Sequence, residues 1–268
     1  MLRVLPTRYT SALPDLRRLL LDLGLVPAEE GEGWAVLDSR SGRVRLRSAE
    51  KGSARDGTTV FGVEIRDPAE FARRTAQDGG QAALEETPAG ARVRITGPDG
   101  FEFLAEPTAH AGRYTDADPD LTVRLEWHTP DLERAAAALA AIGGRPRPHS
   151  MLGPGESREF TAKNGGVLAA VRDAATSVSL AFEYAGPAKE LQPRLALAGW
   201  RMDTEAGRTR DAESAARSVP ETETGREEQE ASLSPGRSGG VVRVTVPLPD
   251  GSAVTILTTG GPERARMR

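Results

Sequence analysis

The chain has no cysteine in its 268 residues. Disulfide bonds, thiolate metal ligands and a cysteine nucleophile are therefore excluded, which fits a reducing compartment. Histidine is almost as scarce, with three copies, and aromatic residues make up only 4% of the chain. Lysine is confined to Lys51, Lys163 and Lys189 although arginine is abundant, a bias that we interpret as GC-rich coding.

Long hydrophobic runs and a large excess of charge of one sign are also lacking. No window approaches the roughly 18 uninterrupted apolar residues of a membrane-spanning helix, and residues 1–8 do not resemble a secretory leader. We therefore expect a cytoplasmic protein without membrane contact. The 35 basic and 39 acidic residues are spread along the chain, so no basic stripe predicts nucleic-acid binding.

The sequence does contain a fourfold repeat of a strand-like run, a turn with proline and a helical stretch. The prolines at the helix starts are Pro14, Pro68, Pro130 and Pro187. The strand-like runs before the helices are residues 3–9, 58–65, 121–129 and 178–184. Short alternating segments typical of antiparallel hairpins follow the helices. The pattern predicts an α+β fold built from four βαβββ units.

The helix ends have recognisable capping signals. Ser11 is the expected N-cap of the first helix, which Gly24 would end. Asp67 and Glu70 have the spacing of a capping box at the second helix. Pro193 falls inside the fourth helix, where it would remove a hydrogen bond, so we expect that helix to be kinked or to start late.

The even-numbered units share a Pro-Asp-Gly turn between two strand-like segments, at residues 98–100 and 249–251. Units one and two are therefore expected to form one domain, residues 1–106, and units three and four a second, residues 120–260. Residues 107–119 would link them. A polar segment near 204–240 has few large apolar side chains, so we expect a disordered insertion, with partner binding as the alternative.

These features resemble the vicinal oxygen chelate (VOC) superfamily, which includes glyoxalase I, bleomycin-resistance proteins and extradiol dioxygenases. The resemblance rests on the paired units, on the helix and its exit at residues 16–25, and on the two Pro-Asp-Gly turns. It implies two tandem glyoxalase-like domains whose curved, mostly antiparallel sheets wrap into cups. In the family's enzymes a cup holds a divalent metal through His, Gln or Glu on the first strands and Glu on the last strand.

The ligand positions that the resemblance implies are not filled by ordinary metal ligands. The last-strand position falls on Leu104 in the first domain and on Thr255 in the second. The first strands of the even units offer only Glu64 and Glu183, and Glu102 or Glu106 would replace Leu104 only if the register shifted by two. We therefore predict no metal and no other cofactor.

One strand keeps a polar face that could serve a ligand. Arg124, Glu126 and His128 alternate along residues 121–129 and would project from the same face of a regular strand. We take these three as candidate ligand-binding residues and assign no catalytic residue. The alternative is a solvated face opposite a core of the intervening apolar residues. His110 and His149 are expected at the surface.

The leading hypothesis is a metal-independent protein that binds a small organic molecule in a cup, by sequestration as in the drug-resistance branch. One alternative is a lyase, isomerase or dioxygenase-like enzyme that uses the face of Arg124. Another is a structural or partner-binding protein whose cups are filled by side chains. We expect a monomer or homodimer. The large aromatics that could form an apolar ligand wall, or simply core, are Trp34, Trp127, Tyr184 and Trp200.

Overall fold

The computed structural model describes residues 1–268 except 89, 109–115, 149, 153–154, 207–240 and 260–268. Four βαβββ units follow one another along the described chain, as the sequence predicts, and the fold is α+β. The helices are α1 (Leu13–Asp22), α2 (Pro68–Gln77), α3 (Leu132–Ala141) and α4 (Ala188–Leu197). No described helix is long and apolar enough to cross a membrane.

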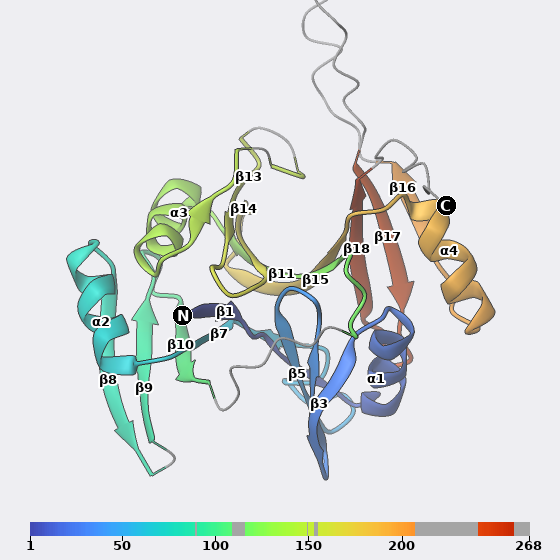
Figure 1. The fold of residues 1–268 in the computed structure, drawn as a ribbon, viewed down its shortest axis with the longest axis horizontal. Coiled ribbons are helices and arrows are strands. Elements are labelled where there is room, and N and C mark those ends of the chain that lie inside the picture. The colour runs from blue at the N-terminus through green and yellow to red at the C-terminus, as the bar shows by residue number, and fades with distance from the viewer. Residues whose placement is uncertain (89, 109–115, 149, 153–154, 207–240, 260–268) are drawn as a thin grey trace, which may run out of the picture.

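The second half of the chain builds one curved sheet of eight strands, in the order β12-β13-β14-β11-β15-β18-β17-β16. We call its concave face, at the top of Figure 1, the second cup. The strands are β11 (Leu121–Thr129), β12 (Arg145–Pro146), β13 (Ser157–Thr161), β14 (Val167–Arg172), β15 (Ser177–Tyr184), β16 (Asp203–Ala206), β17 (Val241–Pro247) and β18 (Ala253–Thr259).

The first half forms two five-stranded sheets, β3-β4-β5-β2-β6 and β1-β7-β10-β9-β8. The predicted strands at 3–9 and 58–65 are each split in two, and Pro6, which has no N–H for a ladder, lies at the first break. We call the hollow between the two sheets the first cup. The strands are β1 (Leu2–Val4), β2 (Thr7–Thr10), β3 (Val26–Gly31), β4 (Trp34–Asp38), β5 (Arg43–Ser48), β6 (Thr59–Val60), β7 (Gly62–Ile65), β8 (Gln81–Thr87), β9 (Gly90–Thr96) and β10 (Glu102–Pro107).

Reciprocal hydrogen bonds join the two halves. Thr10, which ends β2, donates to Asp250 Oδ2 over 2.6 Å, and Thr129, which ends β11, donates to Asp99 Oδ2 over 3.2 Å. Both aspartates belong to the Pro-Asp-Gly turns, which connect β9 to β10 and β17 to β18 as predicted. Each threonine hydroxyl also accepts the backbone N–H two residues further on. The turns of each half therefore fix the helix start of the other.

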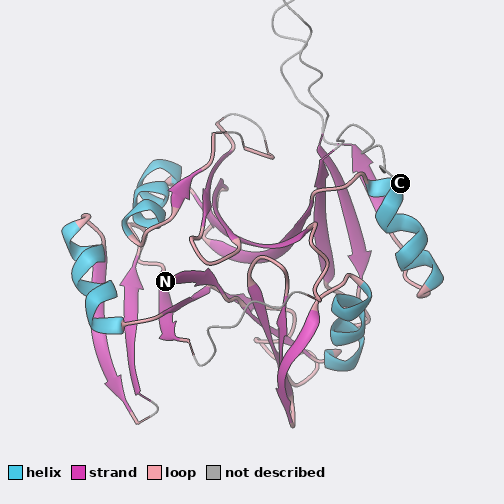
Figure 2. Cartoon of the chain, viewed as in Figure 1, coloured by secondary structure: helices cyan, strands magenta, loops and turns pink. Residues whose placement is uncertain are grey.

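An aromatic cluster fills the boundary between the halves. Trp127 on β11 is fully buried, and its ring centroid lies 4.9 Å from that of Phe101. Phe61 and Phe103 complete the cluster from the first half. These rings belong to a hydrophobic core that includes residues of both halves, and α2 lies beside α3 at one side of the molecule (Figure 2). The placement of a domain boundary at 107–119 stays a prediction.

Several local expectations need correction. Ala12, not Ser11, is the N-cap of α1, because the Ser11 hydroxyl donates instead to Asp56 Oδ2 at 2.8 Å. Asp67 does cap α2 by accepting from the N–H of Glu70. Residues 203–206 form strand β16, so the disorder predicted from 204 is wrong for 204–206, and residues 207–240 of the predicted insertion lie outside the described residues.

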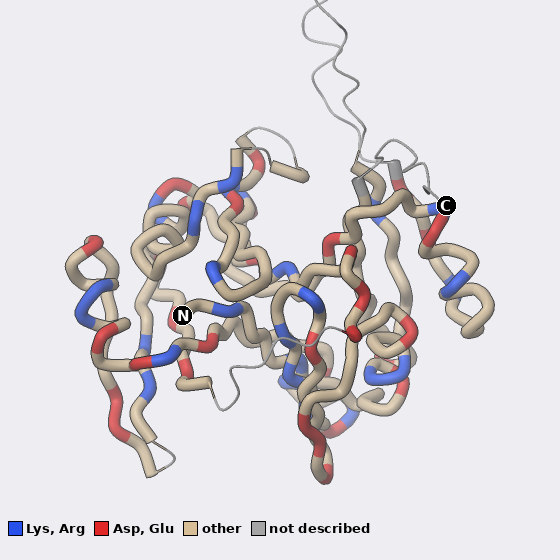
Figure 3. Tube along the Cα trace, in the orientation of Figure 1, with Lys and Arg blue, Asp and Glu red and all other residues tan. Residues whose placement is uncertain are grey.

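The charges in the described chain are mixed. Figure 3 shows Lys and Arg interspersed with Asp and Glu around both cups. Charges of both signs therefore surround the cups, and the ion pairs buried in them define the candidate site.

Candidate functional site in the two cups

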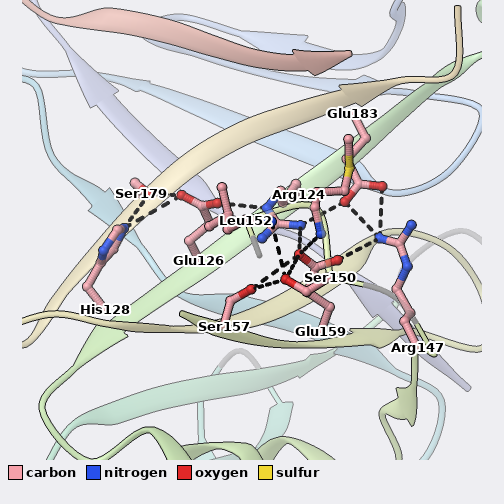
Figure 4. Close-up of polar contacts among 11 residues, drawn as sticks. Arg124, Glu126, His128, Arg147, Ser150, Leu152, Ser157, Glu159, Ser179 and Glu183 are labelled. Carbon is pink, nitrogen blue, oxygen red and sulfur yellow. Dashed lines mark hydrogen bonds and ion pairs between the residues drawn. The ribbon is translucent and has the colours of Figure 1, made fainter. Parts of the chain in front are cut away.

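A buried arginine held by three carboxylates occupies the second cup. The Nε of Arg124 donates to Glu126 Oε1 at 2.7 Å, and its Nη1 lies 3.0 Å from Glu159 Oε1 and 2.8 Å from Glu183 Oε1. Its side chain has 0% exposure. Figure 4 shows the carboxylates, which come from β11, β13 and β15, converging on the guanidinium. Arg147 adds a second cation, 2.8 Å from Glu183 Oε1.

This network fixes the charge states of its members. Burial alone would lower the pKa of Arg124, but the negative charges of Glu126, Glu159 and Glu183 raise it overall. Burial opposes ionisation of Glu126, yet the contact with His128 and the charge of Arg124 lower its pKa to about 2. Arg124 is therefore a permanent internal cation. Its buried Nη2, which carries two N–H groups, has no hydrogen-bond partner among the described residues.

His128, further along β11, lies between the carboxylates of Glu126 and Asp173. Its Nε2 is 2.9 Å from Ser179 Oγ, and its Nδ1 is 3.4 Å from Asp173 Oδ2. Ser179 in turn donates to Glu126 Oε2 at 2.8 Å. The interaction with Glu126 raises the pKa of His128, against the opposing effect of burial. The array can pass a proton between imidazole and carboxylate through the serine hydroxyl.

The structure thus brings together Arg124, Glu126 and His128 on one face, as the strand alternation predicts. Their role in ligand binding stays a prediction, and only Glu126 and His128 have exposed side-chain surface, 12% and 20%. Sequence reasoning missed Glu159, which accepts from the N–H of Met151 at 2.9 Å and anchors the segment before β13. No local motif marks it, because its partners come from three other parts of the chain.

The first cup contains a similar buried network built from different strands. Arg43 on β5 makes a two-pronged contact with Asp38, at 2.6 and 3.0 Å, and its Nη1 donates to Glu64 Oε1 at 3.0 Å. Arg3 on β1 donates to Glu64 Oε2 at 2.6 Å. All four residues are more than nine-tenths buried. Glu64 precedes its helix-start proline by as many residues as Glu183 does in the second half.

A cavity of about 380 Å³ opens beside this network. Trp34 contributes an apolar wall, and Arg47, its cross-strand neighbour, lines the same space. Arg45 is paired with Glu106 at 2.8 Å, whereas Arg47 has no ion-pair partner among the described residues. The cavity therefore combines an indole with an uncompensated guanidinium. The remaining lining residues are Leu5, Glu29, Val36, Arg43, Glu64, Thr87, Gly90, Ala91, Arg92 and Pro107.

The residues present do not fit the metal that the fold family implies. No group of three or more His, Asp or Glu side chains in the described part of the chain is placed to hold an ion. Glu106 does lie beside Glu64 in the strand register, but arginines are bonded to both. In the second cup the residue beside Glu183 on the last strand is Leu257. Guanidinium groups already neutralise the carboxylates of both cups.

Comparison with known proteins gives structural matches only. No family model matches the chain, and no curated protein matches it by sequence. The homoprotocatechuate 2,3-dioxygenase from Arthrobacter globiformis aligns with a TM-score of 0.57 and 17% identity, covering 97% of this chain and 81% of that one. The Mn(II)-bound glyoxalase from Novosphingobium aromaticivorans aligns at 0.55 and 13%, covering 96% and 80%. This is a VOC-like fold. A halotolerant catechol dioxygenase matches similarly, at 0.51 and 10% over 99% and 88%.

Proposed function

We propose that this protein binds a small organic anion with an apolar body in its first cup, without a metal, and acts by sequestering it. The observation behind the proposal is the pairing of Trp34 with the uncompensated Arg47 on the wall of a 380 Å³ cavity. Ligand pockets typically enclose about 300–1,000 Å³ and combine apolar walls with a few polar anchors. A carboxylate suits the fork of a guanidinium, and a ring or alkyl body suits the indole face.

The buried ion pairs beside the cavity would act as its fixed floor. Arg43 is already satisfied by Asp38 and Glu64, so it contributes orientation rather than an open hydrogen-bonding site. Gly31 fixes the wall, since a Cβ at that position would come within 2.4 Å of the Trp34 Nε1. The indole therefore lies directly against the backbone of β3. A rigid aromatic surface loses little entropy when a ligand binds.

The experiment is a thermal-shift screen of aromatic and aliphatic carboxylates, followed by tryptophan fluorescence titration of those that stabilise the protein. Trp127 and Trp200 are buried, so quenching that disappears in a Trp34→Phe variant reports on the first cup. Arg47→Ala should weaken binding about tenfold or more, because a charged hydrogen bond contributes about 1.5–3 kcal/mol. The matched control is Arg134→Ala on the exposed face of α3.

Two outcomes would contradict the proposal. Equal affinity in the wild type, Arg47→Ala and Trp34→Phe would place the ligand elsewhere. Failure of every carboxylate to stabilise the protein would contradict this ligand class and favour the alternative of a structural or partner-binding protein. A cytoplasmic location and a monomeric or homodimeric state remain predictions.

A second function, acid–base catalysis in the second cup, is favoured by the chain of contacts from Asp173 through His128 and Ser179 to Glu126. A lyase or isomerase needs a group that can both give and accept a proton, which such an array supplies. Loss of turnover in a folded His128→Ala variant would support this function. An unchanged rate would end it.

A further inference from the structure

A small cavity lies where two hairpin turns from different halves of the chain meet. The turn between β4 and β5 contributes Arg40 and Ser41, and the turn between β13 and β14 contributes Lys163 and Asn164. The turns touch near the middle of Figure 1, where the N–H of Gly166 donates to Ser41 Oγ at 2.9 Å. The cavity encloses about 250 Å³ and shares no lining residue with the cavity of the first cup.

Two uncompensated cations line this cavity. Arg40 and Lys163 are exposed, and neither has an ion-pair partner among the described residues. The other charged lining residues, Arg3 and Asp38, are bonded within the buried network of the first cup. The cavity therefore has an excess of two positive charges, one from each half of the chain.

Neutral groups of the lining add hydrogen-bond donors. Asn164 Oδ1 accepts from the N–H of Leu2 at 3.1 Å, which fixes the amide and leaves its NH₂ group without a partner among the described residues. Ser41 Oγ accepts from Gly166, so its hydroxyl proton is available for donation. A lining of cations and donors favours an anion rich in oxygen. The remaining described residues of the lining are small: Ser39, Gly42, Thr161, Ala162 and Gly165.

Glycines set the distance between the two turns. Gly42 and Gly165 have φ values of 97° and 125°, which residues with a side chain rarely adopt. A Cβ at Gly165 would lie 2.7 Å from the backbone nitrogen of Gly42. Backbone contact, rather than flexible side chains, therefore fixes the spacing of the segments that carry Arg40 and Lys163. A site that is already in place loses less entropy when a ligand binds.

We propose that this cavity binds a phosphate group between Arg40 and Lys163, either inorganic phosphate or the phosphate of a small monoester. A phosphate monoester carries about 1.5–2 negative charges at pH 7, which matches the two uncompensated cations. Its oxygens can accept from the guanidinium and the ammonium, and from Asn164 and Ser41, at the same time. A carboxylate has one charge and two oxygens, so it would satisfy fewer of these groups.

The test is isothermal titration calorimetry of the full chain at constant ionic strength, with inorganic phosphate and with glycerol 3-phosphate as probes. The wild type should bind one equivalent of at least one probe, and an excess of acetate should not displace it. Tighter binding of glycerol 3-phosphate identifies a phosphorylated metabolite as the source of the phosphate group. Tighter binding of inorganic phosphate identifies the free ion.

Three variants change the cavity, and one serves as a control. Arg40→Met and Lys163→Met each remove a charge but keep an apolar stem, and each should weaken binding about tenfold or more. Asn164→Asp keeps an oxygen for the N–H of Leu2 but replaces the donors by a charged acceptor, so it should abolish binding. Lys51→Met removes one exposed charge beyond the other end of β5 and should bind like the wild type.

Two results would overturn the proposal. Equal affinity in Lys51→Met and in the three cavity variants would place the phosphate elsewhere, and failure of the wild type to bind either probe would remove the site. The exchanged side chains of Arg40 and Lys163 make no bond in the described fold, so these variants should stay folded, as circular dichroism can check. The inference goes beyond the proposed function, because carboxylate binding at Trp34 and Arg47 can persist when phosphate binding fails.

Discussion

Replacing Gly97 by alanine should loosen the boundary between the two halves. Gly97 follows β9 and lies against the indole of Trp127, which belongs to the other half. A Cβ added there would lie 2.3 Å from Cη2 and 2.6 Å from Cζ2 of the indole. Carbon atoms in van der Waals contact are about 3.5–4.0 Å apart, so either the ring or the backbone must move by more than about 1 Å.

The ring has little room to retreat. Trp127 has 0% exposure, and its centroid is 4.9 Å from Phe101 and 6.3 Å from Phe103. Overpacking a well-filled core costs about 1–3 kcal/mol, and the short contact places Gly97→Ala near the upper end of that range. For a chain of this length, about 3 kcal/mol corresponds to a fall in Tm of roughly 6–12 °C.

Urea denaturation followed by circular dichroism measures the effect, with Gly100→Ala as the matched control. Gly100 lies in the same hairpin with a φ of 76° and no atom within 4 Å of an added Cβ, so its substitution tests backbone strain alone. Alanine in that left-handed conformation should cost about 1–2 kcal/mol. If Gly97→Ala is no more destabilising than Gly100→Ala, the aromatic cluster does not fix the two halves, and the reasoning is refuted.

Three further outcomes follow from the contacts described above. The interaction with Glu126 raises the folded-state pKa of His128, so its stabilisation is complete below the unfolded-state pKa of about 6.5 and is lost as pH rises through the higher folded value. Urea titrations across that interval should show the wild type losing stability relative to His128→Gln, and parallel curves would contradict the linkage. Gly31→Ala should displace Trp34 and weaken carboxylate binding in fluorescence titrations, whereas equal affinity would remove the indole from the binding wall. Thr10→Val should lower the free energy of unfolding by about 1 kcal/mol in urea titrations, through loss of the bond to the opposite hairpin; an unchanged value would show that this bond adds no net stability.

Local chemistry explains which parts of the fold the sequence predicts. A Pro-Asp-Gly turn or an Asp67 cap depends on residues a few positions apart, and both are found where they were expected. Ser11 does not cap the first helix, because its hydroxyl donates to Asp56, which is distant in the chain. The breaks in the first strands could not be located from periodicity alone, since strand pairing decides which side of Pro6 joins which sheet.

In the candidate site, too, the sequence predicts what depends on neighbouring residues and misses what depends on distant strands. Strand alternation was enough to place Arg124, Glu126 and His128 on one face. The partners Glu159 and Ser179 escaped prediction because each reaches the site through the register of a different strand. Glu183 was recognised as a carboxylate in a possible ligand position, but the sequence does not reveal that an arginine already neutralises it.

The reciprocal contacts explain how the two cups could diverge while the halves stayed joined. Thr10 with Asp250 and Thr129 with Asp99 repeat one contact with the halves exchanged, so a change in either pair would disturb the one helix start that its threonine precedes, α1 or α3. The concave faces do not take part in these two contacts. The first cup has an open cavity beside its ion pairs. In the second cup, the charge of Arg124 is neutralised by the carboxylates of Glu126, Glu159 and Glu183.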